Sequence, residues 1–420
     1  MEIPSSIAVT TRDVIVPEFT SVAVNDGMGV VITDLDERDI DRERIEGFFR
    51  RVNAHAAANF FDRNRYSISI PELRRALLEG AGGVLERYQL DPTTLARLEW
   101  SGRVPTPAGG AARIEDVVPS QLLPTPFSRC EMGLNFGGNH FLEMQVVDEI
   151  LDPHVARRFG LRKGQIVVMY HLGPGPFSGT LLHHYSRRTK LRRERVPLFF
   201  FSKLLFHFLQ RARRGRMTRK WGLHFKANGT TPYPLESEEG LAIRSAMAMA
   251  INYGFAYRMA TVRAIFDGLH EAVSPNVHAE LLCDIAHNGV YEERYNGGSA
   301  WVARHNACGL APDRPTIVAG SYDIPSYLGI GTGNGDPRLH SYDHGAGHLI
   351  DEYREAGRLE TGPGAVLRMR MTRGRDGRMV KCEAVALHKS EPIDRLMECL
   401  ERNHIMQTVA RLRPIGNLKN

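Results

Sequence analysis

The sequence has little cysteine and no pattern that would pair it. Its 420 residues include five cysteines, an odd number, and no two of them have the Cys-x-x-Cys spacing. This usage argues against a disulfide scaffold or a zinc ribbon and favours a reducing compartment. The chain begins Met-Glu-Ile-Pro, which lacks the cationic and apolar regions of a signal peptide. We therefore expect a cytoplasmic protein.

Long hydrophobic runs are also missing. The longest apolar stretch, 196–209, is interrupted by Pro197, Ser202, Lys203 and His207, whereas a membrane span takes about 20 apolar residues. The stretch predicts a buried strand or a core helix, with an interfacial membrane helix as the alternative, so we expect no membrane partner. The GxGxxG and GxxxxGK[ST] patterns are absent as well, which leaves Rossmann and P-loop sites unsupported.

Positive charge is concentrated in one part of the chain. The formal net charge is +6, but the segment 187–220 carries 13 lysines and arginines against one acid, Glu194. This window has a charge of +12, so the remainder of the chain carries −6. A basic block on an acidic body is typical of a protein that binds RNA or DNA phosphates. The alternatives are a solvated charged face, or contact with an acidic protein or lipid surface.

The pattern of apolar residues predicts a mixture of helices and strands without a strict βαβ rhythm. Helices are expected over 36–61, from Pro71 towards Leu90, over 238–269 and over 394–403. In the long helix over 238–269, the arginines Arg244, Arg258 and Arg263 are expected to mark polar positions. A short strand over 167–169 should lead into His171, and the segments 366–373 and 379–387 should form a hairpin.

Four histidines stand beside glycines or at the ends of apolar runs. His344 precedes Gly-Ala-Gly, which leaves its imidazole open to a bulky electrophile, while His140, His171 and His287 lie in three separate segments. Imidazoles from separate segments are the commonest nitrogen ligands of divalent transition metals. The set therefore suggests a site with a metal and a nucleophile. Spacing alone is not diagnostic, because each histidine could equally be a satisfied core residue.

Taken in order, these segments resemble the RtcB-type RNA ligases, which use GTP and manganese to join a 3′-phosphate or 2′,3′-cyclic phosphate end to a 5′-hydroxyl. The resemblance extends from about residue 15 to the C-terminus. The segments that carry it are Gly-Gly-Asn139-His140-Phe141-x-Glu143, Val-Met-Tyr-His171, Asp284-x-Ala-His287-Asn288, Gly320-Ser321-Tyr322 with Ser326-Tyr327, His344-Gly345-Ala346-Gly347, and Arg411-Leu-Arg-Pro414 with Lys419.

The resemblance implies a role for each matching residue. His344 would be the catalytic nucleophile that becomes guanylylated. The metal ligands would be Asp26, His140, His171 and His287. The nucleotide would be bound by Asn139, Phe141, Glu143, Ser321, Gly345, Ala346, Gly347 and Lys419.

The resemblance also implies a fold, cofactors and a substrate. We expect one α+β domain over 1–420, with mixed sheets flanked by helices around a central cleft and a basic face or insertion at about 187–220. The expected cofactors are GTP and one or two Mn²⁺ ions. The expected partner is RNA with 3′-phosphate and 5′-hydroxyl ends, in splicing or repair.

This chain departs from the family pattern at several positions. Ala23 stands where the family has a metal-binding aspartate, and Asp26 stands where it has a cysteine. A carboxylate is a harder ligand than a thiolate, so the site should be less suited to zinc. Ala23 offers no ligand, so one metal position is better preserved than two. His348 replaces an arginine. Two alternatives follow: a metal-dependent phosphodiesterase or hydrolase of RNA ends, or a non-catalytic RNA-binding paralogue.

Overall fold

The computed structural model describes residues 4–54, 63–107, 113–133, 136–186, 229–295, 297–333, 339–371 and 378–419. The basic block at 187–220 and the apolar stretch at 196–209 lie outside these residues. All five cysteines are free thiols, as the sequence predicts. Within the described ranges, no helix has the length and apolar character needed to cross a bilayer.

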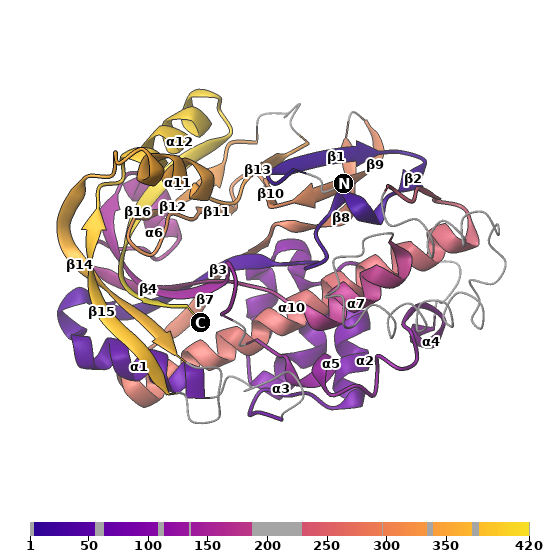
Figure 1. Cartoon of the computed structure of the whole chain (residues 1–420), viewed down its shortest axis with the longest axis horizontal. Coiled ribbons are helices and arrows are strands. Elements are labelled where there is room, and N and C mark those ends of the chain that lie inside the picture. Colours follow the sequence, from indigo (N-terminus) through magenta and orange to yellow (C-terminus); the bar gives the residue numbers. More distant parts are fainter. Residues whose placement is uncertain are drawn as a thin grey trace.

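A nine-stranded sheet forms the centre of the fold (Figure 1). Seven strands follow one another in the order β11 (Pro315–Val318), β12 (Ser326–Gly331), β16 (Met406–Leu418), β4 (Phe141–Ile150), β5 (Gln165–Leu172), β3 (Gly27–Asp36) and β7 (Ala279–Ala286). Each of these neighbours is antiparallel. The sheet is completed by β14 (Thr361–Met371), which runs parallel to β16 and forms a hairpin with β15 (Met379–His388).

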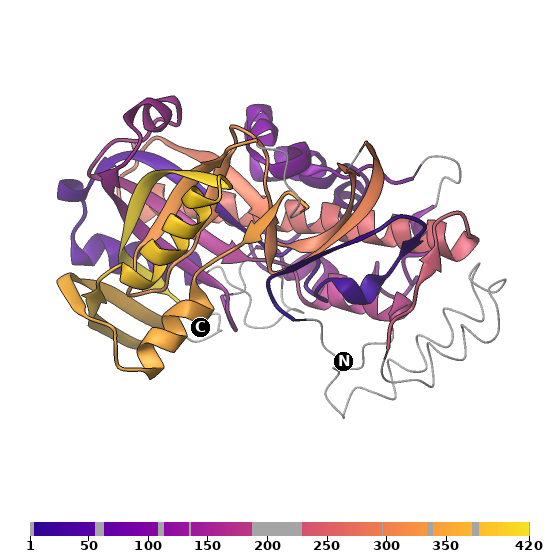
Figure 2. The same ribbon diagram turned by 90° about the horizontal axis from the view of Figure 1, so that it is seen from above.

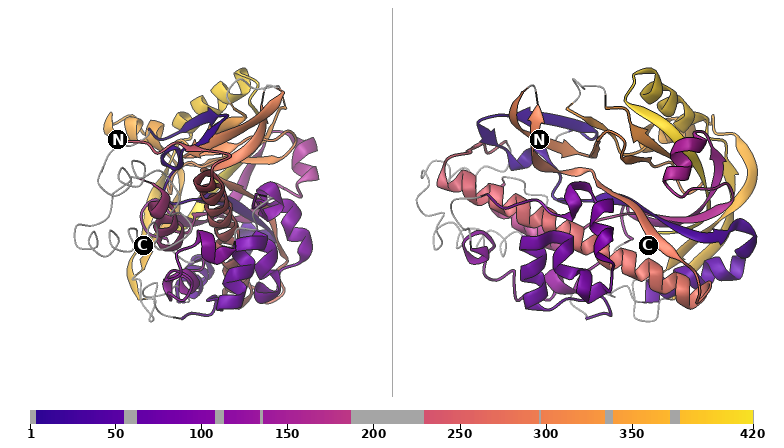
Figure 3. Two further views of the ribbon diagram at one scale, coloured as in Figure 1. Left: turned by 90° about the vertical axis from the view of Figure 1, so that its right-hand side faces the viewer. Right: turned by 180° about the vertical axis from the view of Figure 1, so that it is seen from behind.

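One face of this sheet packs on the long helix α10 (Glu238–Ala272). The helix begins at Ser237, whose side chain accepts a hydrogen bond from the Gly240 amide. Alternate strand residues such as Val31 and Val168 enter the same apolar core as the buried residues of α10. Figure 3 shows the N-terminal helices packed along α10. These helices are α1 (Arg42–Ala54), α2 (Ile70–Glu79) and α3 (Leu85–Tyr88), and α7 (Pro176–Tyr185) also contacts α10.

The other face of the sheet builds a second core. Val30, Val167 and Met169, the alternate residues of β3 and β5, pack there. Three helices carry further side chains of this core: α6 (Pro153–Arg158), α11 (Gly347–Glu355) and α12 (Glu391–Arg402). Figure 2 shows the yellow α12 lying over this C-terminal part of the sheet. The sheet is therefore buried between two layers, and its strands read as nearly continuous apolar runs.

Three smaller sheets complete the described structure. β1 (Ile7–Thr11), β9 (Gly298–His305) and β8 (Asn288–Tyr295) form one beside the large sheet (Figure 1). The other two are pairs, β10 (Ala307–Gly309) with β13 (Ser341–Asp343) and β2 (Val14–Ile15) with β6 (Tyr233–Pro234). Short helices connect these parts: α4 (Ile114–Val117), α5 (Phe127–Cys130), and 3₁₀ segments at Pro17–Phe19, Glu37–Asp39, Gly80–Val84, Pro92–Arg97 and Glu99–Gly102. The expected α+β class is confirmed.

Most of the local predictions are confirmed, and three are wrong. The strand before His171, the helix over 238–269, the hairpin and the helix over 394–403 are all present. The helix expected from residue 36 begins instead at Arg42, because Asp36 ends β3 and caps a 3₁₀ turn. The helix expected from Pro71 towards Leu90 ends at Glu79, a 3₁₀ segment begins at Gly80, and the short helix α3 follows. Arg258 does not mark an exposed polar position of α10. It is fully buried, where it forms an ion pair with Asp284 of β7.

Candidate metal and nucleotide site

Strand register brings three of the predicted metal ligands to one end of the large sheet. Gly27 pairs with Leu172 of β5 on one side and with Ala286 of β7 on the other. Asp26, His171 and His287 stand next to these three residues in the chain, so the ends of β3, β5 and β7 place their side chains together. His140 joins them from the residue before β4, whose first residue pairs with His171.

Asp26 lies at the centre of this group. Its Oδ2 atom is 3.1 Å from Nε2 of His140 and 3.8 Å from Nε2 of His287. Burial alone would raise the pKa of this carboxyl, but the contacts with His140, together with the charges of His171 and Arg258, hold the pKa below its ordinary value. Asp26 is therefore a buried carboxylate. Ala23 begins the turn that ends at Asp26 and supplies no ligand.

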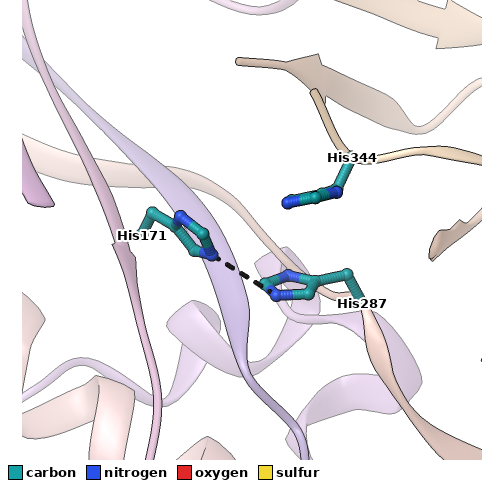
Figure 4. A group of neighbouring side chains, drawn as sticks. All are labelled: His171, His287 and His344. Atoms are coloured by element: carbon teal, nitrogen blue, oxygen red, sulfur yellow. Dashed lines mark hydrogen bonds between the residues drawn. The ribbon is translucent and has the colours of Figure 1, made fainter. Parts of the chain in front are cut away.

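Burial favours the neutral form of two histidines of the group, His171 and His287. Burial lowers the pKa of His171 to about 3 and lowers the pKa of His287 well below its ordinary value. Their Nε2 atoms lie 3.3 Å apart, and one ring nitrogen of each lies within 4.8 Å of a ring nitrogen of His344 (Figure 4). A neutral imidazole is the form that binds a metal.

His344 follows β13 and presents one nitrogen to the group. Its Nδ1 atom lies 3.0 Å from the carbonyl oxygen of Asn306 and 3.1 Å from Oδ1 of Asp343. Because both partners are hydrogen-bond acceptors, Nδ1 carries a proton, and in the neutral ring Nε2 is the nitrogen with the lone pair. The ring stacks on that of His287, with centroids 4.7 Å apart (Figure 4). This arrangement suits a nucleophile, and the sequence had not indicated the part played by Asp343.

A buried ion pair supports the loop that carries Asp26. Arg258 of α10 and Asp284 of β7 are both fully buried, and Nε and Nη2 of the arginine each lie 2.7 Å from a carboxylate oxygen. Nη1 of Arg258 donates to the backbone oxygen of Asn25, and the hydroxyl of Tyr170 donates to Asp284. The motif around Asp284 was visible in the sequence, but this contact with α10 was not.

The donor set fits a divalent transition metal. Within the described residues, Oδ1 of Asp26 and Nδ1 of His287 are buried and have no hydrogen-bond partner. Unsatisfied buried polar atoms are costly, and a bound ion is one way to satisfy them. A carboxylate together with neutral imidazoles gives mixed oxygen and nitrogen ligation, which suits borderline cations such as Mn²⁺ better than an all-sulfur site would.

A second group of predicted residues lies along β4. It begins at Phe141, the first residue of the strand, and includes Glu143, two residues further along. Phe141 meets the ring of His171 edge-on, with centroids 5.3 Å apart. Glu143 is buried, and its two oxygens accept hydrogen bonds from Asn417 at 2.9 Å and from Gln145 at 2.8 Å. Burial raises the pKa of Glu143 to about 8. Gln145 also reaches Ser326 of β12, whose hydroxyl accepts from the Gly320 amide next to Ser321.

Three cationic side chains, Arg368, Arg370 and Lys419, lie near this second group. Arg368 of β14 lies opposite Asn417 in the sheet, and its guanidinium carbon is 4.0 Å from the centroid of the Tyr322 ring. Burial and the charges of Arg368 and Arg370 lower the pKa of Lys419, which shows that the three cations lie near one another. Two arginines of β14 therefore lie near Lys419, which the sequence had not indicated.

The remaining predicted nucleotide-binding residues lie in turns around these two groups. Asn139 is exposed in the turn before His140. Gly345 and Ala346 pair with the backbone of Ala319, and Gly347 begins α11 with open space around its Cα. No side chain caps this helix end. The uncapped start of a helix is a place where an anion such as a phosphate can bind.

Comparison with known proteins gives the same family that the motifs suggested. The family model described as tRNA-splicing ligase RtcB matches residues 3–420. A tRNA-splicing ligase RtcB of Pyrococcus horikoshii is 26% identical over 427 residues, which cover 95% of this chain and 44% of that protein. The protein of the same name from Pyrobaculum aerophilum is 26% identical over 441 residues, 97% of this chain and 82% of that protein.

A bacterial relative matches over a shorter segment. The RNA-splicing ligase RtcB of Mycobacterium bovis is 26% identical over 309 residues, 69% of this chain and 65% of that protein. The chain spans less than half the length of the Pyrococcus relatives that it matches. The family match nevertheless covers nearly the whole chain. The histidine group at the ends of β3, β5 and β7 therefore stands in a chain that belongs to the RtcB family.

Proposed function

We propose that this protein is a GTP- and Mn²⁺-dependent RNA ligase that joins 3′-phosphate or 2′,3′-cyclic phosphate ends to 5′-hydroxyl ends. One observation carries the proposal: the Nε2 atom of His344 is free because both partners of Nδ1 are acceptors, and the ring stands against the buried histidines. In the neutral ring this tautomer makes Nε2 the nitrogen that can attack phosphorus.

His344 would act first. Its Nε2 would attack the α-phosphorus of GTP, forming a phosphorus–nitrogen bond to GMP and releasing pyrophosphate. Asp343 and the Asn306 carbonyl would hold the Nδ1 proton and stabilise the positive charge that develops on the ring. A divalent ion held by Asp26, His140, His171 and His287 would neutralise the triphosphate. The GMP would then pass to the RNA 3′-phosphate, and the 5′-hydroxyl would displace it.

The residues along β4 and β16 would bind the nucleotide. The carboxyl of Glu143 would face the guanine edge, with Phe141 on the side of the metal group and Ser321 in the adjoining turn. Lys419 and its arginine neighbours would attract the phosphates or the RNA. The backbone amides at the start of α11 would donate hydrogen bonds to a phosphate oxygen.

Two other functions remain as alternatives within the same family. A metal-dependent hydrolase of RNA ends would need the metal group but not a nucleophilic His344. An RNA-binding paralogue would need neither. The preserved tautomer and position of His344 favour the ligase over both. We also propose that residues 1–420 act as one domain in the cytoplasm.

The test is guanylylation of the purified protein. With α-labelled GTP and Mn²⁺, the wild type should acquire an acid-labile label that survives denaturation, because a phosphoramidate is acid-labile. His344→Ala should acquire none, whereas the matched variant His404→Ala, which changes an exposed histidine after α12, should label like the wild type. Absence of label on the wild type, alongside an authentic ligase that labels, would reject the ligase chemistry.

A further inference from the structure

Trp100 is held in an unusual backbone conformation outside the histidine group. It lies in the 3₁₀ segment Glu99–Gly102 with φ 55° and ψ 22°, and Ser101 follows with φ 52° and ψ 32°. Two successive residues other than glycine in the left-handed region are uncommon, and such strain persists where the surrounding structure demands it. The Trp100 side chain remains 40% exposed.

A cavity of about 400 Å³ lies beside Trp100. Its walls include Tyr291 of β8 and Trp301 of β9, together with Pro105, Thr106 and Arg244. The rings of Trp100 and Tyr291 are parallel within 4°, with centroids 5.8 Å apart. The guanidinium carbon of Arg244 lies 5.1 Å from the Trp301 ring centroid, and its buried Nε has no hydrogen-bond partner within the described residues. The cavity therefore offers aromatic faces and one arginine side chain.

A second cavity, of about 570 Å³, also borders Trp100. Arg97, Arg158 and Arg314 line it. Arg158 lies 3.6 Å from Asp313, and Arg97 lies 4.0 Å from Glu280, so both retain loose surface pairs. Arg314 donates to the backbone oxygen of Leu98 and forms no ion pair with the residues described here. Glu99, Asp284, Glu293 and Asp313 also line the second cavity, so it sets arginines among carboxylates beside the aromatic pocket.

Hydrogen bonds connect residues that line the two cavities to the segments that carry Asp26 and His287. Glu99, the neighbour of Trp100, accepts a hydrogen bond from the amide of Ala286, which precedes His287. The hydroxyl of Tyr291 lies 3.3 Å from Oδ1 of Asn25, which precedes Asp26.

We propose that the 400 Å³ cavity binds an unpaired base of the RNA, stacked on Trp100 and held by Arg244, while Arg314 in the second cavity contacts a backbone phosphate. Stacking on aromatic side chains and Arg is a general way to bind single-stranded nucleic acid, because every base has a π-face. The inference rests on RNA being the substrate in the proposed function, and it adds a base site away from the nucleotide and metal residues.

The test measures equilibrium binding of a fluorescent single-stranded RNA with a 5′-hydroxyl end. Trp100→Ala should weaken binding by about 5- to 150-fold, the loss that one base–aromatic stack typically causes. Trp100→Phe, which keeps an aromatic face, should retain most of the affinity. Val380→Ala, at an exposed apolar residue of β15, should bind like the wild type. Wild-type affinity in Trp100→Ala would overturn the proposal.

Two further variants keep the test independent of folding. Arg244→Gln leaves the aromatic walls in place and should also weaken binding, while thermal melting checks that every variant is folded. Arg314→Gln should reduce the slope of log affinity against log salt by about one, because one phosphate contact is lost. Weakening by Trp100→Ala with unchanged affinity in both arginine variants would overturn the assignment of the arginines.

The outcome can be separated from that of the proposed function. Guanylylation uses GTP and no RNA, so Trp100→Ala should still label at His344. Trp100-dependent RNA binding in a protein that never labels would uphold the base site and reject the ligase chemistry. Normal labelling in a wild-type protein that does not bind the RNA probe would overturn the base site.

Discussion

The carboxylate of Asp26 lies 3.1 Å from the imidazole Nε2 of His140, although 114 residues separate them in the chain. Its second oxygen is buried and has no hydrogen-bond partner within the described residues. The contact puts a carboxylate, a hard oxygen donor, beside His140, at the position where the resemblance leads us to expect a cysteine. It makes Asp26 the residue on which the metal specificity of this chain should depend.

Substitution of Asp26 tests this assignment. Asp26→Ala should lower Mn²⁺ affinity because a direct metal ligand is lost. The loss should exceed the roughly 10- to 100-fold loss that typically follows removal of a residue that only hydrogen-bonds to a metal ligand. Asp26→Cys should restore or raise metal affinity and shift preference towards zinc, because thiolate is a softer ligand. Titration calorimetry measures both, with Asp34→Ala, an exposed acid of the same strand, as control. Unchanged affinity in both variants would remove Asp26 from the site.

Asp343 should position His344 rather than bind metal. Burial alone would raise the pKa of Asp343, but hydrogen bonds from His344 and Ser6 hold it below its ordinary value, so the group is a carboxylate. Asp343→Ala should slow single-turnover guanylylation by about 10- to 100-fold. Asp343→Asn keeps an acceptor for the Nδ1 proton and should recover part of the rate. Equal rates in the two variants, or a parallel loss of Mn²⁺ affinity, would contradict a positioning role.

The buried carboxyl of Glu143 should make stability depend on pH. Its ordinary pKa of 4.5 is raised to about 8 by burial, so between these pH values the folded chain holds a proton that the unfolded chain has released. The contribution of Glu143 to the free energy of unfolding is therefore full below pH 4.5 and falls as pH rises towards 8. The slope approaches about 1.4 kcal/mol per pH unit.

Glu143→Gln cannot ionise and should lack this part of the slope. Urea unfolding without nucleotide at pH 5, 6.5 and 8 should show the wild type losing stability relative to the variant. Glu398→Gln, on the exposed face of α12, should follow the wild type. Parallel pH curves for the wild type and Glu143→Gln would show that Glu143 is already ionised in the folded protein.

The buried pair of Arg258 and Asp284 should be important for stability. Arg258→Met leaves a buried carboxylate without its partner, which typically lowers the free energy of unfolding by about 3 to 5 kcal/mol. Arg263→Met, five residues further along α10, removes one partner of the buried Asp267, which keeps its contacts with Tyr66 and Arg65, and should cost about 1 kcal/mol. Urea unfolding compares the two variants. Equal losses would mean that Asp284 is satisfied by Tyr170 alone.

The local structure was largely readable from the sequence. The strand that ends at His171 and the long helix α10 were predicted because both depend on apolar periodicity within one segment. The helix expected from residue 36 was misplaced because Asp36 serves both as the end of β3 and as a cap. Arg258 was predicted to be exposed because arginine is usually exposed in a helix. It is buried here because it forms an ion pair with Asp284, which lies on β7 and not on the same helix.

The sequence by itself determined which residues are available for chemistry, and its ordered motifs indicated the family that the comparison then showed. Only the tertiary structure decided that His171 and His287, 116 residues apart, place their Nε2 atoms 3.3 Å from each other. That proximity depends on β3 lying between β5 and β7, and strand order is set by packing over the whole sheet. For the same reason, the position of Asp343 beside the His344 ring and the setting of Trp100 between two cavities became visible only in the folded chain.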